Sequence, residues 1–185
     1  MTAFSRRRFI VAASAPFAVA ACGNGVGSTG GGRIDARVDE ATNFMYDTLP
    51  ETQTLASKSA GVLMMPLITE AGFGIGGGFG RGALRIDNVT VDYYSSTNAS
   101  IGLQIGAQQY AHALFFMTPA SLNSFRSSPG WVAGADLEYA VSSNSGALTT
   151  DTTSLLTPVV AVVFGQAGLI AGATVEGQKY NRIIP

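Results

Sequence analysis

The stretch EAGFGIGGGFGRGALRI, residues 70–86, has a glycine at every second position from Gly72 to Gly82. The positions between these glycines carry Phe, Ile, Gly, Phe and Arg, in that order. Because side chains alternate between the two faces of a strand, the pattern predicts a strand with one bare face and one apolar face that ends in charge. A bare face lets another backbone or a helix lie against the sheet at close range, or lets the sheet coil tightly.

Two other interpretations of this stretch fit less well. The spacing Gly72-x-Gly74-x-x-Gly77 matches a phosphate-binding fingerprint, but that motif requires a helix directly after it. Here the chain runs into a turn at Asp87-Asn88, and no Gly-Lys-Ser/Thr sequence follows. A flexible linker would not interleave Phe and Ile so regularly. The sequence therefore favours a strand over a nucleotide site.

The rest of the chain predicts an α+β fold around this strand. An apolar stripe with helical spacing predicts a helix over residues 34–49, and a second short helix follows Pro50 and ends before Gly61. A third short helix is expected over 119–126. The expected fold is a strand-dominated, curled antiparallel sheet with two N-terminal helices and one short inserted helix. The expected strands are 61–68, 72–86, 89–94, 100–117, 131–141, 159–164 and 169–180, with the last two forming a hairpin.

Length and composition narrow the function classes. The chain has 185 residues, of which 46% are apolar and 12% are charged, and this favours one packed domain over a disordered chain. The formal net charge of −1 gives no nucleic-acid footprint, so we expect no nucleic-acid partner. One cysteine and one histidine leave little material for a metal site or a catalytic triad. We therefore expect no metal and no other cofactor.

The first 22 residues have the layout of an export signal. Three arginines at 6–8 precede an apolar stretch over 9–21, which is too short to span a bilayer comfortably. The segment SRRRFI resembles a twin-arginine signal, and VAAC, which ends at Cys22, resembles a bacterial lipobox. In lipoproteins that cysteine receives a diacylglycerol, and the mature N-terminus carries three acyl chains, such as palmitate. A plain secretory signal with an incidental or buried Cys22 is the alternative.

Three segments are expected on this basis. Residues 1–21 form a twin-arginine lipoprotein signal peptide, 22–33 an acylated cysteine with a Gly/Ser tether, and 34–185 the folded domain. Gly23 rather than Asp follows the cysteine, which by enterobacterial sorting rules indicates the outer membrane, with the domain facing the periplasm. Without the signal, eight basic and twelve acidic residues remain, a net charge of about −4. Binding to anionic lipid must then come from a local cluster.

Four sequence blocks, in order and spacing, resemble the SYLF domain of bacterial lipoproteins and of eukaryotic lipid- and actin-binding proteins. They begin with KSAGVLMMPL at 58, VDYYSSTNAS at 91, FRSSPGW at 125 and DTTSLLTPVV at 151. The resemblance runs from about residue 34 to the C-terminus and implies lipid binding. Eukaryotic members use an amphipathic N-terminal segment and basic side chains, and yeast relatives bind actin. Actin binding is not carried over to a bacterial envelope protein, and the matching segment 34–49 is acidic here, which argues against its direct insertion into an anionic membrane.

Lys58, Arg81 and Arg85 are the basic residues nearest to the glycine-rich strand, and they form the expected lipid-headgroup site. Arg81 and Arg85 lie four residues apart and so share a strand face, from which they would meet a phosphate group bidentately. The alternative is a solvated strand end, or ion pairs with Glu70 or Asp87.

Other polar and aromatic residues give weaker signals. His112 lies in an aromatic-rich strand without an identifiable nucleophile or orienting partner, so a structural role is more typical there than catalysis. Residues 151–153 fit a turn or a helix cap, and nothing physical supports a ligand contact there. The aromatic residues expected in the core or at its rim, where a surface cluster would grip acyl chains, are Tyr93, Tyr94, Tyr110 and Trp131.

The expected function is that of an outer-membrane lipoprotein whose periplasmic domain binds phospholipid, anionic lipid or a membrane surface without catalysis. The alternative is a structural or protein-interaction module of the cell envelope, with an envelope protein docked on the glycine-faced sheet. An enzyme is not expected, because no set of catalytic groups is recognisable.

Overall fold

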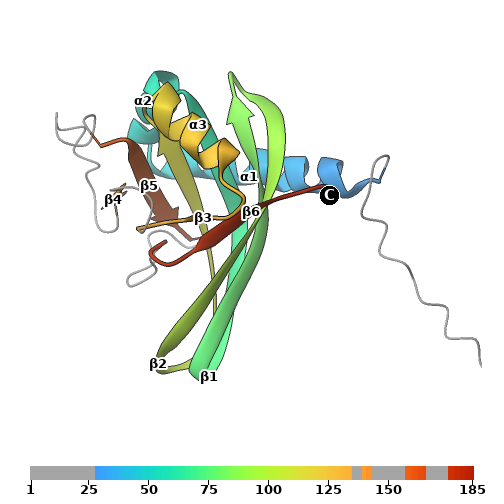
Figure 1. Cartoon of the computed structure of the whole chain (residues 1–185), viewed down its shortest axis with the longest axis vertical. Coiled ribbons are helices and arrows are strands. Elements are labelled where there is room, and N and C mark those ends of the chain that lie inside the picture. The colour runs from blue at the N-terminus through green and yellow to red at the C-terminus, as the bar shows by residue number, and fades with distance from the viewer. Residues whose placement is uncertain (1–27, 135–138, 143–156, 166–174) are drawn as a thin grey trace, which may run out of the picture.

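The structure is a computed structural model, and it describes residues 28–134, 139–142, 157–165 and 175–185. Two helices at the N-terminal side precede two long strands, and a third helix and four short strands follow (Figure 1). The elements in chain order are α1 (Gly30–Thr48), α2 (Glu51–Lys58), β1 (Gly61–Ile86), β2 (Val89–Phe116), α3 (Pro119–Ser127), β3 (Trp131–Val132), β4 (Tyr139–Ser142), β5 (Val159–Phe164) and β6 (Lys179–Ile183).

The six strands of the described residues form one sheet with β2 at its centre. β1 pairs with β2 along one edge, while β5 pairs with residues 111–116 of β2 and β6 with residues 93–97 along the other. These pairs are antiparallel, as is β3 with β6, whereas β4 and β5 run parallel. The predicted strand-dominated α+β class is confirmed, and the parallel pair is a departure from the predicted pairing.

β1 and β2 form a single long hairpin, closed by a turn in which Asp87 and Asn88 both have positive φ angles, of 50° and 63°. Positive φ at both central residues gives a turn whose twist matches the flanking strands. Near the middle of the hairpin the pairing shifts, because Phe73 pairs with Ile105 but Gly74 pairs with Gly102. Extra residues on one strand bend a ribbon, and Figure 1 shows the hairpin reaching the lower end of the molecule and returning.

The bare face of β1 is filled by the first half of the same strand. A Cβ atom on Gly80 would lie 2.5 Å from the carbonyl oxygen of Leu67, and one on Gly82 would overlap the carbonyl oxygen of Met64. These contacts are centred on residues 73–74, where the pairing shifts. The glycines therefore let the hairpin double back on itself at backbone contact distance, as the alternating pattern predicts.

The sheet separates two layers of core. Alternate residues of β2 and β5 point to opposite faces, so that Val159, Ala161 and Val163 pack on the α3 side and Val160 and Val162 on the α1 side. The α3 side also holds the largest buried rings, which are Trp131, Phe125, Phe116, Tyr94 and Tyr180.

Several elements differ from those predicted. The predicted strands 61–68 and 72–86 form the single strand β1, and the predicted strands 89–94 and 100–117 form the single strand β2. α1 begins at Gly30, so residues expected in the flexible tether form its first turn. The predicted hairpin between 159–164 and 169–180 is not formed as such, because β5 pairs with β2 and β4, and β6 pairs with β2 and β3. Residues 166–174, which include half of the second predicted strand, lie outside the described residues.

The helices within the described ranges are all too short or too polar to cross a lipid bilayer.

Candidate functional site

Among the described residues, a groove of about 680 Å³ lies between α1 and the sheet. We call it the α1 groove. Its volume lies in the range of small-molecule sites, which are mostly apolar with a few placed polar groups. The residues that line it are Arg37, Glu40, Ala41, Phe44, Pro66, Leu67, Gln109, Tyr110, Ala111, Phe164 and Gly165.

A proline in β1 accounts for the irregular strand beside the groove. Pro66 lacks a backbone N–H and cannot complete the ladder, so the pairing shifts between Met65 and Ile68, leaving Pro66 and Leu67 without register partners. The bulge places these two residues along the groove. Where α1 meets β5, the ring of Phe44 stacks on that of Phe164, with 6.2 Å between ring centroids.

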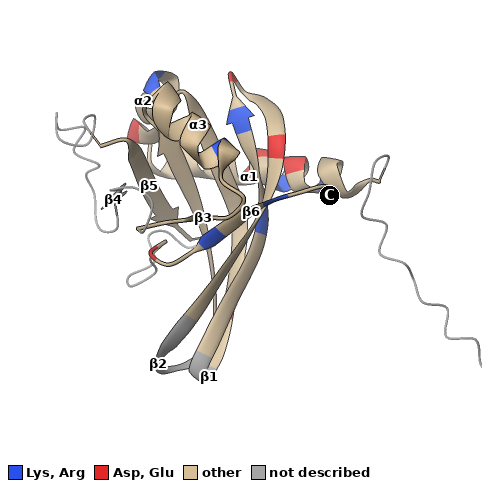
Figure 2. Ribbon diagram, in the orientation of Figure 1, with Lys and Arg blue, Asp and Glu red and all other residues tan. Residues whose placement is uncertain are grey.

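α1 is held against the hairpin by its own acidic residues. Asp35 accepts hydrogen bonds from the Thr90 hydroxyl at 2.9 Å and from the Tyr93 hydroxyl at 2.7 Å. Asp39 pairs with the guanidinium of Arg85 at 2.7 Å. Figure 2 shows charged residues gathered around the helices and the upper sheet, with few on the lower hairpin.

These internal contacts bear on the expectation that the acidic segment 34–49 does not insert into an anionic membrane. Asp35 and Asp39 are occupied by internal partners, whereas Arg33 and Arg37 are exposed. Arg37 lies at the groove together with Glu40, one turn further along the helix. The helix therefore directs Asp35 and Asp39 toward the hairpin and places the cation of Arg37 beside the carboxylate of Glu40 at the groove.

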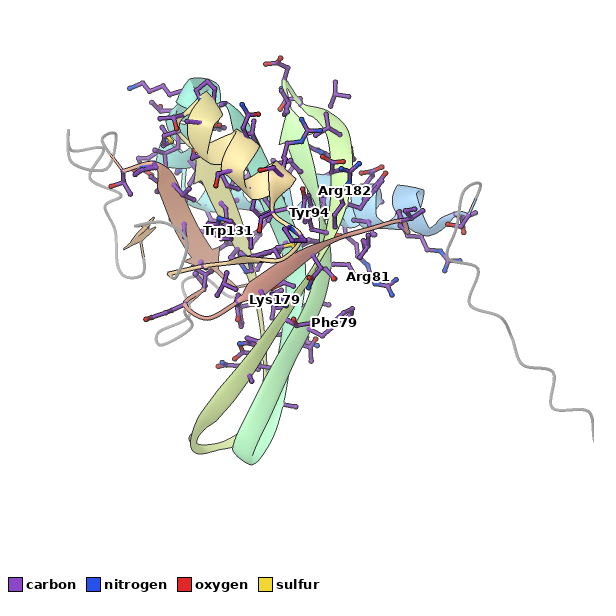
Figure 3. The ribbon with its side chains drawn as sticks, viewed as in Figure 1. Phe79, Arg81, Tyr94, Trp131, Lys179 and Arg182 are labelled. Carbon is purple, nitrogen blue, oxygen red and sulfur yellow. The ribbon has the colours of Figure 1, made fainter. Side chains whose placement is uncertain are left out.

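The three basic residues predicted to bind a headgroup do not meet at one site. Lys58 is exposed at the end of α2, and Arg85 is bound to Asp39. Arg81 is exposed, with its guanidinium 5.7 Å from the centre of the Phe79 ring (Figure 3). Arg81 and Arg85 do share a strand face, but α1 covers the Arg85 end of it. Of the three, Arg81 is the one that offers a free cation on the outside of the sheet.

Asp92 is a buried carboxylate bound on both oxygens. It accepts from Nε of Arg126 on α3 and from Nε of Arg182 on β6, each at 2.9 Å. A buried charge is costly unless it is paired, and here the pairing ties a helix and a strand to β2. We assign these three residues to structure rather than to ligand binding.

A second polar network, centred on the Glu70 carboxylate, joins β1 to β2. The carboxylate of Glu70 accepts hydrogen bonds from Asn98, from Gln108 at 2.7 Å and from the Tyr110 hydroxyl at 2.7 Å. Burial raises the pKa of Tyr110, and its hydrogen bond to Glu70 raises it further, so this hydroxyl remains a proton donor. Tyr110 in turn accepts from Gln178 at 2.6 Å. The network occupies the Glu70 carboxylate with internal donors and joins β1 to β2 within the hairpin.

His112 lies in the core and not at the groove. Its Nε2 atom is 2.8 Å from the Tyr180 hydroxyl, and burial lowers its pKa to about 3. Trp131 and Tyr94 are also buried, Tyr110 lies at the edge of the groove and Tyr93 at the α1 contact. Residues 151–153 lie outside the described residues.

Sequence reasoning did not identify the residues of the α1 groove. One signal was present, since Arg37, Glu40, Ala41 and Phe44 have the spacing of one helix face. The other wall depends on Pro66 and on the pairing of β2 with β5, which is a long-range contact that no local pattern reveals.

Residues 97–182 match the family model Ysc84, whose description is "Las17-binding protein actin regulator". The match confirms the resemblance to the SYLF family over these residues. It spans β2 from Thr97 and β5, which supply one wall of the groove, whereas α1 and β1 precede it. No curated protein matches the chain.

Proposed function

We propose, from the SYLF domain that residues 97–182 carry, that this protein is an outer-membrane lipoprotein whose periplasmic domain holds a phospholipid in the α1 groove without changing it chemically. A SYLF domain implies a lipid- or actin-binding module. The observation that carries the choice of lipid is the groove itself, which combines an apolar lining with a cation at its mouth.

The lining fits an acyl chain. Phe44, Leu67 and Phe164 present hydrocarbon to the groove, and each buried methylene group of a ligand contributes about 0.8 kcal/mol. An acyl chain that buries six methylenes would gain about 5 kcal/mol, before the cost of ordering it. The groove therefore offers apolar surface that favours an acyl chain as its occupant.

The mouth of the groove fits a phospholipid headgroup. Arg37 supplies a guanidinium for a phosphate, and Glu40, at i+3 on the same helix, supplies a carboxylate for an ammonium group. A headgroup that carries both charges, such as phosphoethanolamine, matches this pair better than a purely anionic one.

Blocking the groove tests the proposal. Ala41→Trp places a large ring into the groove, and we expect it to lower the amount of non-covalently bound lipid at least tenfold. The measurement is organic extraction of the purified full chain and mass spectrometry of the extract, since extraction leaves covalent acyl chains on the protein. Ala71→Trp, at an exposed position of β1, is the matched control and should retain wild-type lipid.

An equal lipid content in the two tryptophan variants, both folded by circular dichroism, would contradict the assignment of the groove. Arg37→Glu gives a second readout. It should shift the extracted lipids away from phosphate-bearing headgroups, because a carboxylate repels phosphate at the mouth.

Acylation at Cys22 is the expected means of attachment. The exported protein should begin at Cys22 and carry a mass increment of a diacylglycerol and one further acyl chain. Cys22→Ala should remove the increment and shift the protein from the membrane to the soluble fraction. An exported product with an unmodified Cys22 would contradict the lipoprotein assignment.

The alternative function is that of an interaction module, with a protein partner docked on the glycine-bearing face of β1. That face is covered by residues 64–68 of β1, so a partner would have to use another surface. The actin role in the family description is separable by experiment. Co-sedimentation of the full chain with filamentous actin, together with an empty lipid extract, would favour that role over lipid binding.

A further inference from the structure

One part of the sheet surface, beyond the Arg85 end that α1 covers, lies outside the site described so far. Phe79, Thr97 and Lys179 lie side by side across β1, β2 and β6, and so do Arg81, Ser95 and Asn181. Paired residues of adjacent strands point to the same face, and the intervening row of Gly80, Ser96 and Tyr180 is buried. We call the six residues Phe79, Arg81, Ser95, Thr97, Lys179 and Asn181 the outer face.

The outer face combines cations with an exposed ring. Arg81, Lys179 and Thr97 are exposed, and the Phe79 side chain is 50% exposed, which is high for a large apolar residue. The Arg81 guanidinium lies 5.7 Å from the centre of the Phe79 ring, and Lys179 lies two strands away on β6, across Thr97. Figure 3 shows the three side chains where β6 crosses the hairpin. The six positions include no carboxylate, so this face is positive although the chain as a whole has a net charge of −1.

Two residues of the outer face lie on β6, and the chain after β6 contacts the N-terminal segment. β6 ends at Ile183, and two residues later the carbonyl oxygen of Pro185 accepts a 2.6 Å hydrogen bond from the Ser28 hydroxyl. Cys22 precedes Ser28 by six residues, which span at most about 20 Å when extended. Lys179 precedes Pro185 by the same number, so an anchor at Cys22 and the outer face can reach one plane.

We propose that the outer face is the surface on which the domain rests against an anionic phospholipid bilayer. Phe79 enters the interface, and Arg81 and Lys179 bind lipid phosphates. The attachment at Cys22 belongs to the proposed function, on which this orientation rests, but the face is separate from the α1 groove. Each cation at an anionic surface strengthens binding about fivefold. Two cations give only weak binding to a domain that is free in solution, but they are sufficient for a domain that an anchor already holds at the membrane.

A fluorophore at residue 79 tests the orientation directly. The full chain with Cys22→Ser and Phe79→Cys, labelled with bimane, is mixed with vesicles of 30% phosphatidylglycerol and 70% phosphatidylcholine. We expect a blue-shifted emission that doxyl-labelled lipids quench. The same label at position 58, introduced by Lys58→Cys on α2, should show neither effect.

Charge reversal gives the second arm. Arg81→Glu with Lys179→Glu should weaken vesicle binding, measured by the emission shift at residue 79, at least about 30-fold, because two cations are lost and two carboxylates are added. Pure phosphatidylcholine should give no shift. Lys58→Glu is the charge-matched control and should leave the shift unchanged. An unshifted emission at residue 79 on the anionic vesicles, or a shift that survives the double reversal, would overturn the proposal. Neither outcome alters the lipid content of the α1 groove, which extraction measures separately.

Discussion

Gly82→Ala is expected to destabilise the protein by about 3–5 kcal/mol, a large part of the stability of an ordinary domain. The new methyl group would overlap the Met64 carbonyl oxygen and lie 2.6 Å from the Met65 sulfur. The Met64 carbonyl belongs to the backbone of a paired strand, so it cannot move aside as a flexible side chain would. The measurement is chemical denaturation of the full chain followed by circular dichroism.

Gly77→Ala is the matched control within the same glycine stretch. A Cβ atom there would have as its nearest neighbour the Asn98 carbonyl oxygen, at 3.4 Å, which is an ordinary contact. Neither Gly77 nor Gly82 has a positive φ angle, so both accept alanine as far as the backbone conformation is concerned. We expect Gly77→Ala to change stability by less than about 1 kcal/mol. Equal effects of the two substitutions would contradict the doubled hairpin.

Acid is expected to destabilise the protein through His112, the only histidine of the chain. Burial lowers its pKa to about 3, whereas an unfolded chain has a histidine pKa of about 6.5. The unfolded state therefore takes up the proton first, so stability falls as the pH drops below about 6.5 and levels off below about 3. Between pH 7 and pH 5 the loss should be about 2 kcal/mol.

His112→Phe isolates this effect, because phenylalanine fills a similar space without titrating. The variant loses the hydrogen bond to Tyr180 at every pH, so its stability at pH 7 should be lower. Its stability should nevertheless change little between pH 7 and pH 5, where carboxyl groups with ordinary pKa values remain largely ionised. The test is a series of urea denaturation curves at each pH. A His112→Phe variant that loses as much stability as the wild type over this range would contradict the assignment.

Much of the fold could be predicted from local patterns. The alternating glycines indicated a strand with a bare face, because period-two alternation is a property of a single strand and needs no knowledge of partners. Helical spacing likewise predicted α1, and the pair Thr118-Pro119 predicted α3, because threonine is a common N-cap and proline fits the first turn. In the structure Thr118 accepts a hydrogen bond from the Ser121 N–H.

The features that could not be predicted depend on contacts between residues that lie far apart in the sequence. The bare face is covered by β1 itself, which only the bend near residues 73–74 reveals. Asp35 and Asp39 made α1 look acidic, and only the docked helix gives Asp35 its hydroxyl donors and Asp39 its ion pair with Arg85. The α1 groove could not be predicted either, because its lining comes from α1, β1, β2 and β5, which lie far apart in the sequence.

The most direct test of the α1 groove is to map where an acyl chain lies. A phosphatidylethanolamine with a diazirine in one acyl chain would be bound to the full chain, photolysed, and the crosslinked peptides identified by mass spectrometry. We expect crosslinks to the walls of the α1 groove, at Phe44, Leu67 and Phe164. Crosslinks that avoid these three residues, or that survive unchanged in Ala41→Trp, would contradict the account.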